Sequence, residues 1–222
     1  MHFHLPKPLH GWREFAGEVG IIVLGVLLAL AAEELVEWTH DQHQLAEARE
    51  ALRTELSYDA ASLRAIAAQD PCADVRLMFL ESWAKGNTTI NSTHLASMTN
   101  RPLLYTLSTT AWEVTKASTI AARMPIKERL RYATIYDELD NEKGHVLDER
   151  RAWDLLARYA GQDTLTPEEG RTLQADLGSV RVRDDDRRFN TPSLLAKIAG
   201  LGVKPDPSFE ERDPRHLCSP PN

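Results

Sequence analysis

The sequence predicts an all-α protein in which an N-terminal transmembrane helix continues into a long stalk helix packed in an up-and-down helical bundle. Three observations predict this class. An uncharged apolar run stands near the N-terminus, apolar residues then recur at helical spacing, and no alternating run of strand length follows. We expect a short N-terminal segment over 1–14, an anchor helix over 15–36, an all-helical domain over 37–199 and a Pro-rich tail over 200–222.

The apolar run from Val19 to Ala32 reads VGIIVLGVLLALAA and has fourteen residues without a charge. As a helix it covers about 21 Å, less than a hydrocarbon core of about 30 Å. Extension over residues 15–36 gives roughly 33 Å and places Trp12 and Trp38 near the two membrane interfaces. We interpret the segment as a retained membrane anchor.

Two other interpretations remain open. Lys7 and Arg13 form a weakly basic leader, and Ala29-Leu30-Ala31 is a plausible cleavage site, so the segment fits a signal peptide. Against this, the leader carries Glu14 and Glu18, and the helical pattern continues past the proposed cut. Apolar runs this short also occur in buried or interfacial helices.

The basic residues predict an orientation. Lys7 and Arg13 precede the apolar run, and the next Lys or Arg is Arg49. The positive-inside rule then leaves the N-terminus in the cytoplasm and the bulk of the chain outside. We expect a single-pass protein of a bacterial inner membrane with a periplasmic domain.

Composition excludes some classes of function. The 222 residues carry a formal charge of −7, which argues against nucleic-acid binding. Cys72 and Cys218 lack the spacing of a zinc ribbon or redox pair. In an oxidising periplasm they can form one disulfide that closes a loop of about 146 residues, and two free thiols are the alternative.

The first part of the bundle follows from periodicity and punctuation. A helix is expected from Glu33 to Ala68, ended by Asp70-Pro71 because Pro lacks an N–H group. One side of this helix carries a seam of apolar residues at heptad a and d positions, which polar residues interrupt. The seam includes Leu35, Trp38, Leu45, Leu52, Leu56, Leu63 and Ile66. A second helix over 73–84 should end at Lys85-Gly86, before a loop over 87–105 with one helical turn at most.

Four further helices complete the expected bundle. The first runs over 110–122, capped by Ser108 or Thr109, and the second over 126–159. Thr166-Pro167-Glu168-Glu169 is a capping box that starts a helix reaching Asp186, and a short separate helix is expected over 192–199. We interpret the mixed-charge run over 181–189 as a solvated helix face.

One set of residues has the spacing of metal ligands. Glu37, His40 and His43 follow at intervals of three, and Glu-x-x-His occurs in di-iron bundles. The only second pair of this kind on a predicted helix is Glu142 with His145, at an expected bend. We interpret the first set as a polar collar, and expect no metal and no cofactor.

The apolar helix also carries residues suited to contact with another helix. Glu18 lies between Gly17 and Gly20, and Gly25 with Ala29 continues a face of small residues. A carboxyl at membrane depth indicates a partner helix or proton path, and headgroup level is the alternative. We expect contact with another membrane protein, or self-association, through this helix.

Recognisable catalytic signatures are missing from the sequence. Ser108, Thr109 and Thr110 lie downstream of His94, but no G-x-S-x-G turn, Walker loop, G-x-G-x-x-G or HExxH is present. The hydroxyls are therefore expected to cap a helix, and the protein is expected not to be an enzyme.

The block GWREFAGEVGIIVLGVLLALAAE over 11–33 resembles the N-terminal motif of a family of uncharacterised bacterial single-pass proteins. The match covers Gly17, Glu18, Gly25 and the Leu28-Ala29-Leu30 segment, and STTAWEVTKASTIAARMP over 108–125 is similar to a later block. The resemblance implies membrane anchoring and a helical extracytoplasmic domain, with no known activity.

These observations predict a non-enzymatic protein that acts through protein–protein contacts, as a scaffold or accessory subunit of a membrane complex. A periplasmic ligand-binding sensor domain that works with a separate partner is the main alternative. A metalloprotein built on Glu37, His40 and His43 is the second.

Overall fold

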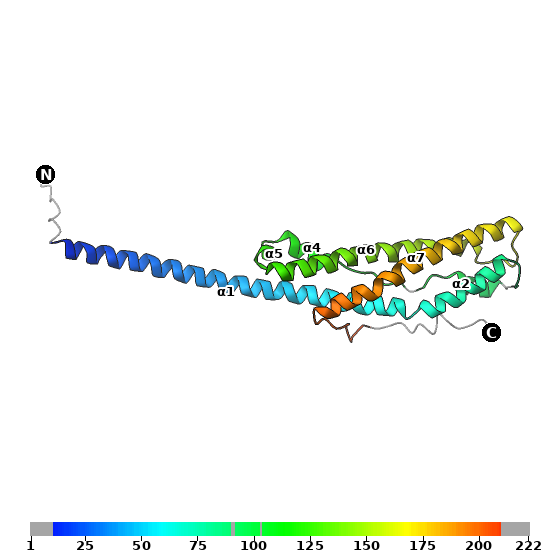
Figure 1. The fold of residues 1–222 in the computed structure, drawn as a ribbon, viewed down its shortest axis with the longest axis horizontal. Coiled ribbons are helices and arrows are strands. Elements are labelled where there is room, and N and C mark those ends of the chain that lie inside the picture. Colours follow the sequence, from blue (N-terminus) through cyan, green and yellow to red (C-terminus); the bar gives the residue numbers. More distant parts are fainter. Residues whose placement is uncertain (1–10, 90–91, 103, 210–222) are drawn as a thin grey trace. The chain divides into compact units, whose positions relative to one another are not determined.

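The computed structural model describes residues 11–89, 92–102 and 104–209, and it is all-α over these ranges, without a strand (Figure 1). Its helices are α1 (Trp12–Ala67), α2 (Asp70–Ala84), α3 (Ser92–Thr99), α4 (Thr110–Ala117), α5 (Ile120–Arg123), α6 (Ile126–Leu156) and α7 (Pro167–Gly200), with a 3₁₀ turn over Ala157–Tyr159. Lys7 and Cys218 lie outside the described residues.

The chain divides into two compact units, Met1–Glu47 and Ala48–Asn222, and α1 continues through the division. Among the described residues, α1 is the one helix long and apolar enough to cross a membrane, and its apolar stretch lies in the first unit. Its apolar side chains are exposed throughout the run from Val19 to Leu30. This part of the molecule confirms the expected long N-terminal apolar helix.

The predicted seam of α1 is buried along the second unit. Leu52, Leu56, Leu63 and Ile66 are almost fully buried there, and Leu45 is buried in the first unit. Leu35 and Trp38, by contrast, are mostly exposed.

Several helix boundaries differ from expectation. Pro71 stands in the first turn of α2, where its missing N–H costs nothing, so the helix starts at Asp70 instead of residue 73. The expected helix over 110–122 is two short helices, because the chain turns to an extended conformation at Ser118. A regular eight-residue helix, α3, replaces the single turn expected in the loop over 87–105.

Helix α7 begins as predicted but does not end as predicted. Thr166 Oγ1 accepts the Glu169 N–H at 3.2 Å, and Glu169 Oε2 accepts the Thr166 N–H at 2.7 Å, which completes the capping box. The helix then continues through Pro192 to Gly200, so the expected separate helix over 192–199 is wrong. Buried residues on both sides of Pro192 explain this, since their packing outweighs one lost hydrogen bond.

One apolar core of the second unit lies between α2, α3, α6 and α7. It includes Trp153 of α6, which is 1% exposed, and apolar side chains from all four helices. The buried set comprises Ala73, Leu77, Leu80, Trp83, Leu95, Met98, Ala152, Trp153, Leu156, Tyr159, Leu173, Leu177 and Val180. Burial of this surface is the main source of stability for the unit.

The chain after α7 packs back onto α1. Ser57 Oγ donates to the Lys204 carbonyl at 2.7 Å, and the Asp206 N–H donates to the Ser57 carbonyl at 3.0 Å. The Phe209 ring then lies edge-on to Tyr58 and Tyr105, with centroids 5.2 and 5.0 Å away. The predicted tail therefore starts with an ordered segment.

One glycine marks a close approach of α7 to α2. A Cβ on Gly170 would lie 2.7 Å from the Ala84 carbonyl oxygen, whereas a Cβ on Gly178 of the same helix would meet nothing within 4 Å. We expect Gly170→Ala to destabilise the protein by about 1–3 kcal/mol through overpacking. Gly178→Ala, the matched control, should stabilise it by about 0.5–1 kcal/mol. Thermal unfolding followed by tryptophan fluorescence measures both, and equal effects would show that the close approach is absent.

Candidate functional site

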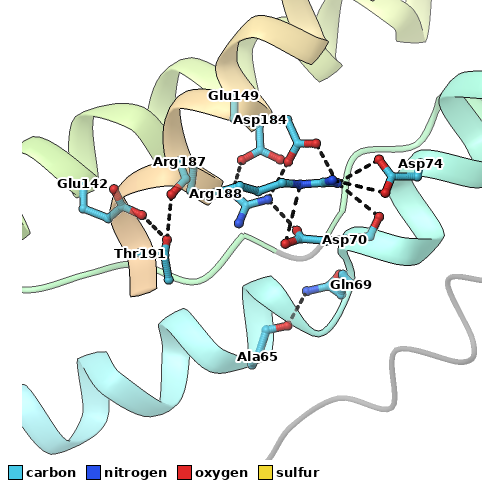
Figure 2. Close-up of polar contacts among 10 residues, drawn as sticks. All are labelled: Ala65, Gln69, Asp70, Asp74, Glu142, Glu149, Asp184, Arg187, Arg188 and Thr191. Carbon is cyan, nitrogen blue, oxygen red and sulfur yellow. Dashed lines mark hydrogen bonds and ion pairs between the residues drawn. The ribbon is translucent and has the colours of Figure 1, made fainter. Parts of the chain in front are cut away.

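The most unusual feature of the second unit is a group of charged side chains buried between α2, α6 and α7 (Figure 2). We call it the Arg187 cluster. It consists of Asp70 and Asp74 from α2, Glu149 from α6, and Asp184, Arg187 and Arg188 from α7.

Arg187 lies at the centre of this cluster and is 1% exposed. Its Nε donates to Glu149 Oε2 at 2.6 Å, and its Nη2 donates to Asp70 Oδ1 and Asp184 Oδ1, each at 2.6 Å. One guanidinium thus bonds carboxylates from three helices. Charge-assisted hydrogen bonds of this length are the strong class in proteins.

Arg188 forms the partly exposed edge of the cluster. Its Nη2 lies 2.6 Å from Asp184 Oδ2 and 3.0 Å from Asp74 Oδ1, and it also donates to the Asp70 carbonyl at 3.2 Å. Asp184 and Asp70 each contact both arginines. The start of α2 is therefore attached to α7 by Asp70 and Asp74, which pair with Arg187 and Arg188.

Burial and charge compete within the cluster. Burial alone would lower the pKa of Arg187, but Glu149 and Asp70 raise it above its ordinary value, so the guanidinium stays charged. Burial raises the pKa of Glu149 and Asp184, and the charge of Arg187 opposes that rise. The cluster is thus an ion-pair network with Arg187 at its buried centre and Arg188 at its edge.

A second polar contact continues the network along the α6–α7 seam. Thr191 Oγ1 donates to the buried Glu142 Oε1, and it also contacts the Arg187 carbonyl at 3.0 Å. Burial raises the pKa of Glu142. His145 lies beside a polar cleft of about 310 Å³ that Glu142 and Asn190 also line.

The interpretation of residues 181–189 as a solvated face is wrong for its central members. Asp184 and Arg187 are buried, whereas Val182 and Phe189 are exposed. A signal for this was present in the sequence. Buried residues of α7 follow alternating spacings of four and three, at Leu173, Leu177, Val180, Asp184, Arg187, Thr191, Leu194 and Ile198. This heptad register places the charges on the seam.

A second group of carboxylates fixes the N-terminus of α4, and we call it the α4 clamp. Glu55 of α1 accepts the Ala111 N–H at 3.0 and 3.1 Å, and Ser108 Oγ donates to it at 2.5 Å. Asp59, one turn further along α1, accepts the Ser108 N–H at 3.0 Å. The contact with Glu55 satisfies the Ala111 N–H, which a helix start leaves unbonded, and Asp59 fixes the residue before the cap.

The expected capping by hydroxyl side chains is therefore only partly right. Thr109 occupies the cap position of α4, but its side chain makes no capping hydrogen bond. Ser108 Oγ accepts the Thr110 N–H at 3.3 Å, and Glu55 supplies the shorter contact. A carboxylate placed 56 residues upstream does what the local sequence predicts for a hydroxyl.

The aromatic side chains of this region pack beneath α4. Trp112 is stacked on Tyr136 of α6 at 5.7 Å between centroids, and Tyr136 Oη donates to the Leu52 carbonyl at 3.2 Å. Trp112 is therefore a core residue.

The residues expected to contact another membrane helix do not share a single face. At about 100° per residue, Glu18, Gly25 and Ala29 of α1 lie within roughly 40° of one another, and Gly20 lies about 140–180° away. Gly17 lies between these two faces. A Cβ on Gly17, Gly20 or Gly25 would meet nothing within 4 Å. The helix therefore offers one coherent face of small residues with a carboxyl, formed by Glu18, Gly25 and Ala29.

The metal-ligand candidates make local contacts. His40 Nε2 lies 2.8 Å from Gln44 Nε2, and His43 Nε2 lies 3.3 Å from Glu47 Oε1, both at exposed positions. Within the described ranges, no group of three His, Cys, Asp or Glu side chains is placed to hold a metal ion. Nothing here assigns chemistry to Glu37, His40 and His43.

The expected disulfide involves a residue outside the described part of the chain. Cys72 is buried in the first turn of α2, next to Asp70, and is disulfide-bonded. Its pairing with Cys218 stays a prediction.

Comparison with known proteins gives no assignment. No protein-family model, curated protein or solved structure matches this chain. The resemblance of the N-terminal block to a bacterial single-pass family stays an expectation.

The Arg187 cluster predicts a large effect of one substitution. Arg187→Gln leaves Glu149 buried without its cation and leaves Asp184 with Arg188 alone, and we expect a loss of about 3–5 kcal/mol in unfolding free energy. Arg183→Gln is the control, because Arg183 forms only an exposed pair with Asp186 at 3.6 Å. Its effect should stay below about 0.5 kcal/mol. Thermal and urea unfolding measure both, and a mild effect of the first substitution would contradict the network.

Asp59 predicts a pH dependence of stability. Burial, and then the nearby Glu55, raises its pKa to about 7, although the Ser108 N–H opposes the rise. Because the folded pKa lies above the unfolded one, its stabilising contribution is complete below about pH 4 and is lost as the pH rises through about 7. Between about pH 5 and 8, the unfolding free energy of Asp59→Asn should rise by about 2 kcal/mol relative to that of the wild type.

Unfolding midpoints of both proteins across this pH range test the effect of Asp59. Asp148→Asn removes an exposed carboxylate of α6 and should leave the pH slope unchanged. Parallel pH profiles of the wild type and Asp59→Asn would show that Asp59 does not titrate in this range.

Proposed function

We propose that this chain is a single-pass inner-membrane protein, with its N-terminus in the cytoplasm and its helical bundle in the periplasm. It acts without catalysis, through protein–protein contacts, as a scaffold or accessory subunit of a membrane complex.

The observation that carries the proposal is the exposed apolar surface of α1. Large apolar side chains between Val19 and Leu30 are 41–74% exposed. Leaving such side chains in water costs about 25 cal/mol for each Å² of apolar surface. Lipid is the environment that covers every side of one isolated apolar helix.

The contact part of the proposal is supported by the face of Glu18, Gly25 and Ala29. Small residues let another helix backbone approach closely, and association between helices in lipid depends on such packing. A carboxyl on the same face can accept a hydrogen bond from the partner helix. The bundle contributes a rigid body, because its buried carboxylates hold its own helices together.

Two properties of the native, C-terminally tagged chain test the proposal. We expect the full-length mass in the membrane fraction after carbonate extraction, and one cross-linked species with a partner or a second copy. Gly25→Leu with Ala29→Leu should abolish the cross-link and leave the chain in the membrane, since bulk blocks close approach. Gly20→Leu adds bulk on the opposite face and should leave the cross-link intact.

The outcomes separate the alternatives. A soluble species that begins near Ala32 would mean a cleaved signal peptide and would favour a periplasmic ligand-binding sensor. Retention in the membrane without any cross-linked species would contradict the scaffold. Equal loss of the cross-link in both variants would mean that the Glu18 face is not the contact.

A further inference from the structure

We propose that the end of the bundle formed by α4, α5 and the start of α6 is a membrane-contact surface that docks on anionic lipid headgroups. We call it the basic tip. Its basic residues are Lys116, Arg123 and Lys127, and its exposed apolar residues are Val114, Ile126 and Leu130. The proposal rests on the membrane anchor proposed above.

Charge is the first argument for this surface. The whole chain carries a formal charge of −7, yet residues 111–135 contain five Lys or Arg and two Asp or Glu. Glu113 pairs with Lys116 at 2.8 Å and Glu128 with Arg49 at 2.7 Å, and this range keeps three more basic than acidic residues (five less two). The tip is thus a cationic region on an anionic protein, and it fits an anionic occupant.

The exposed apolar side chains decide the kind of occupant. Val114 is 66% exposed, and Ile126 and Leu130 are 55% and 58% exposed. Ile126 and Leu130 are four residues apart, so they lie on one face of α6, beside Lys127. Basic groups interleaved with apolar side chains fit a lipid interface, where phosphates meet the charges and the acyl boundary receives the apolar groups.

The position of the tip in the second unit is the third argument. Arg49 contacts Glu128, and Glu55 contacts Ala111, so the tip lies at the end where α1 enters this unit (Figure 1). Twelve residues of α1 lie between Val36 and Arg49, and the rise from one to the other is about 20 Å along a helix. This end of the unit is therefore the one that follows the anchor along the chain.

Hydrogen–deuterium exchange of the full-length chain in lipid nanodiscs tests the proposal. One disc contains phosphatidylcholine alone, and the other contains about 30% phosphatidylglycerol. We expect peptides over residues 112–131 to exchange about threefold more slowly in the anionic disc, and salt at about 0.5 M to abolish the difference. Peptides of α7 over 173–186 should exchange equally in both discs.

Substitutions separate the basic tip from general charge effects. A variant with Lys116→Gln, Arg123→Gln and Lys127→Gln should lose the difference between the two discs. The control variant Arg151→Gln with Arg183→Gln removes two exposed basic residues elsewhere on the bundle and should keep it. Equal slowing in both discs, or slowing only in discs that hold two copies, would indicate a protein contact and overturn the proposal. Absence of slowing in either disc would also overturn it.

Failure of the anchor would be recognised separately. A chain that does not co-elute with either disc refutes the membrane span. The basic tip is then tested by co-sedimentation of the soluble chain with phosphatidylglycerol vesicles, against phosphatidylcholine vesicles. Equal recovery with the two kinds of vesicle would refute the tip as well.

Discussion

The guanidinium of Arg187 is buried, so carboxylates within the bundle must balance its charge. Its partners come from α2, α6 and α7, so these three helices can pack only in the register that brings the carboxylates to it. A shift of one helix along another would leave a buried charge without its partner, which costs far more than an apolar mismatch. The cluster therefore contributes mainly to the uniqueness of the packing, and the apolar core around Trp153 contributes the stability.

Much of the fold was predictable because the apolar residues of long amphipathic helices recur at a regular spacing. The buried residues of α6 follow intervals of three and four from Tyr132 through Leu139 and Val146 to Trp153, and those of α7 do the same. The capping box at Thr166 and the glycine stop after α2 depend on neighbouring residues alone, so both were found. The break within 110–122 and the continuation through Pro192 were missed, since distant packing decides them.

The charged sites were harder to predict for a related reason. A mixed-charge run is usually solvated, and local composition gives no sign that Asp184 and Arg187 pair with residues of two other helices. Only the heptad register, applied to polar as well as apolar positions, places them inside. Glu55 gave no comparable signal, because its role depends on a loop 53–56 residues away. Buried carboxylates with raised pKa thus occur in both clusters, at positions that the apolar pattern alone does not identify.

The contact between Glu55 and Ala111 also sets an order of events during folding. Helix α4 has eight residues, too few for an isolated helix to persist in water, and the Ala111 N–H in its first turn is bonded by a carboxylate on α1. Closing a loop of this length is entropically costly until other contacts hold its ends together. Helix α4 should therefore form late, after α1 and α6 have paired, so the basic tip is completed only on a bundle that has already assembled.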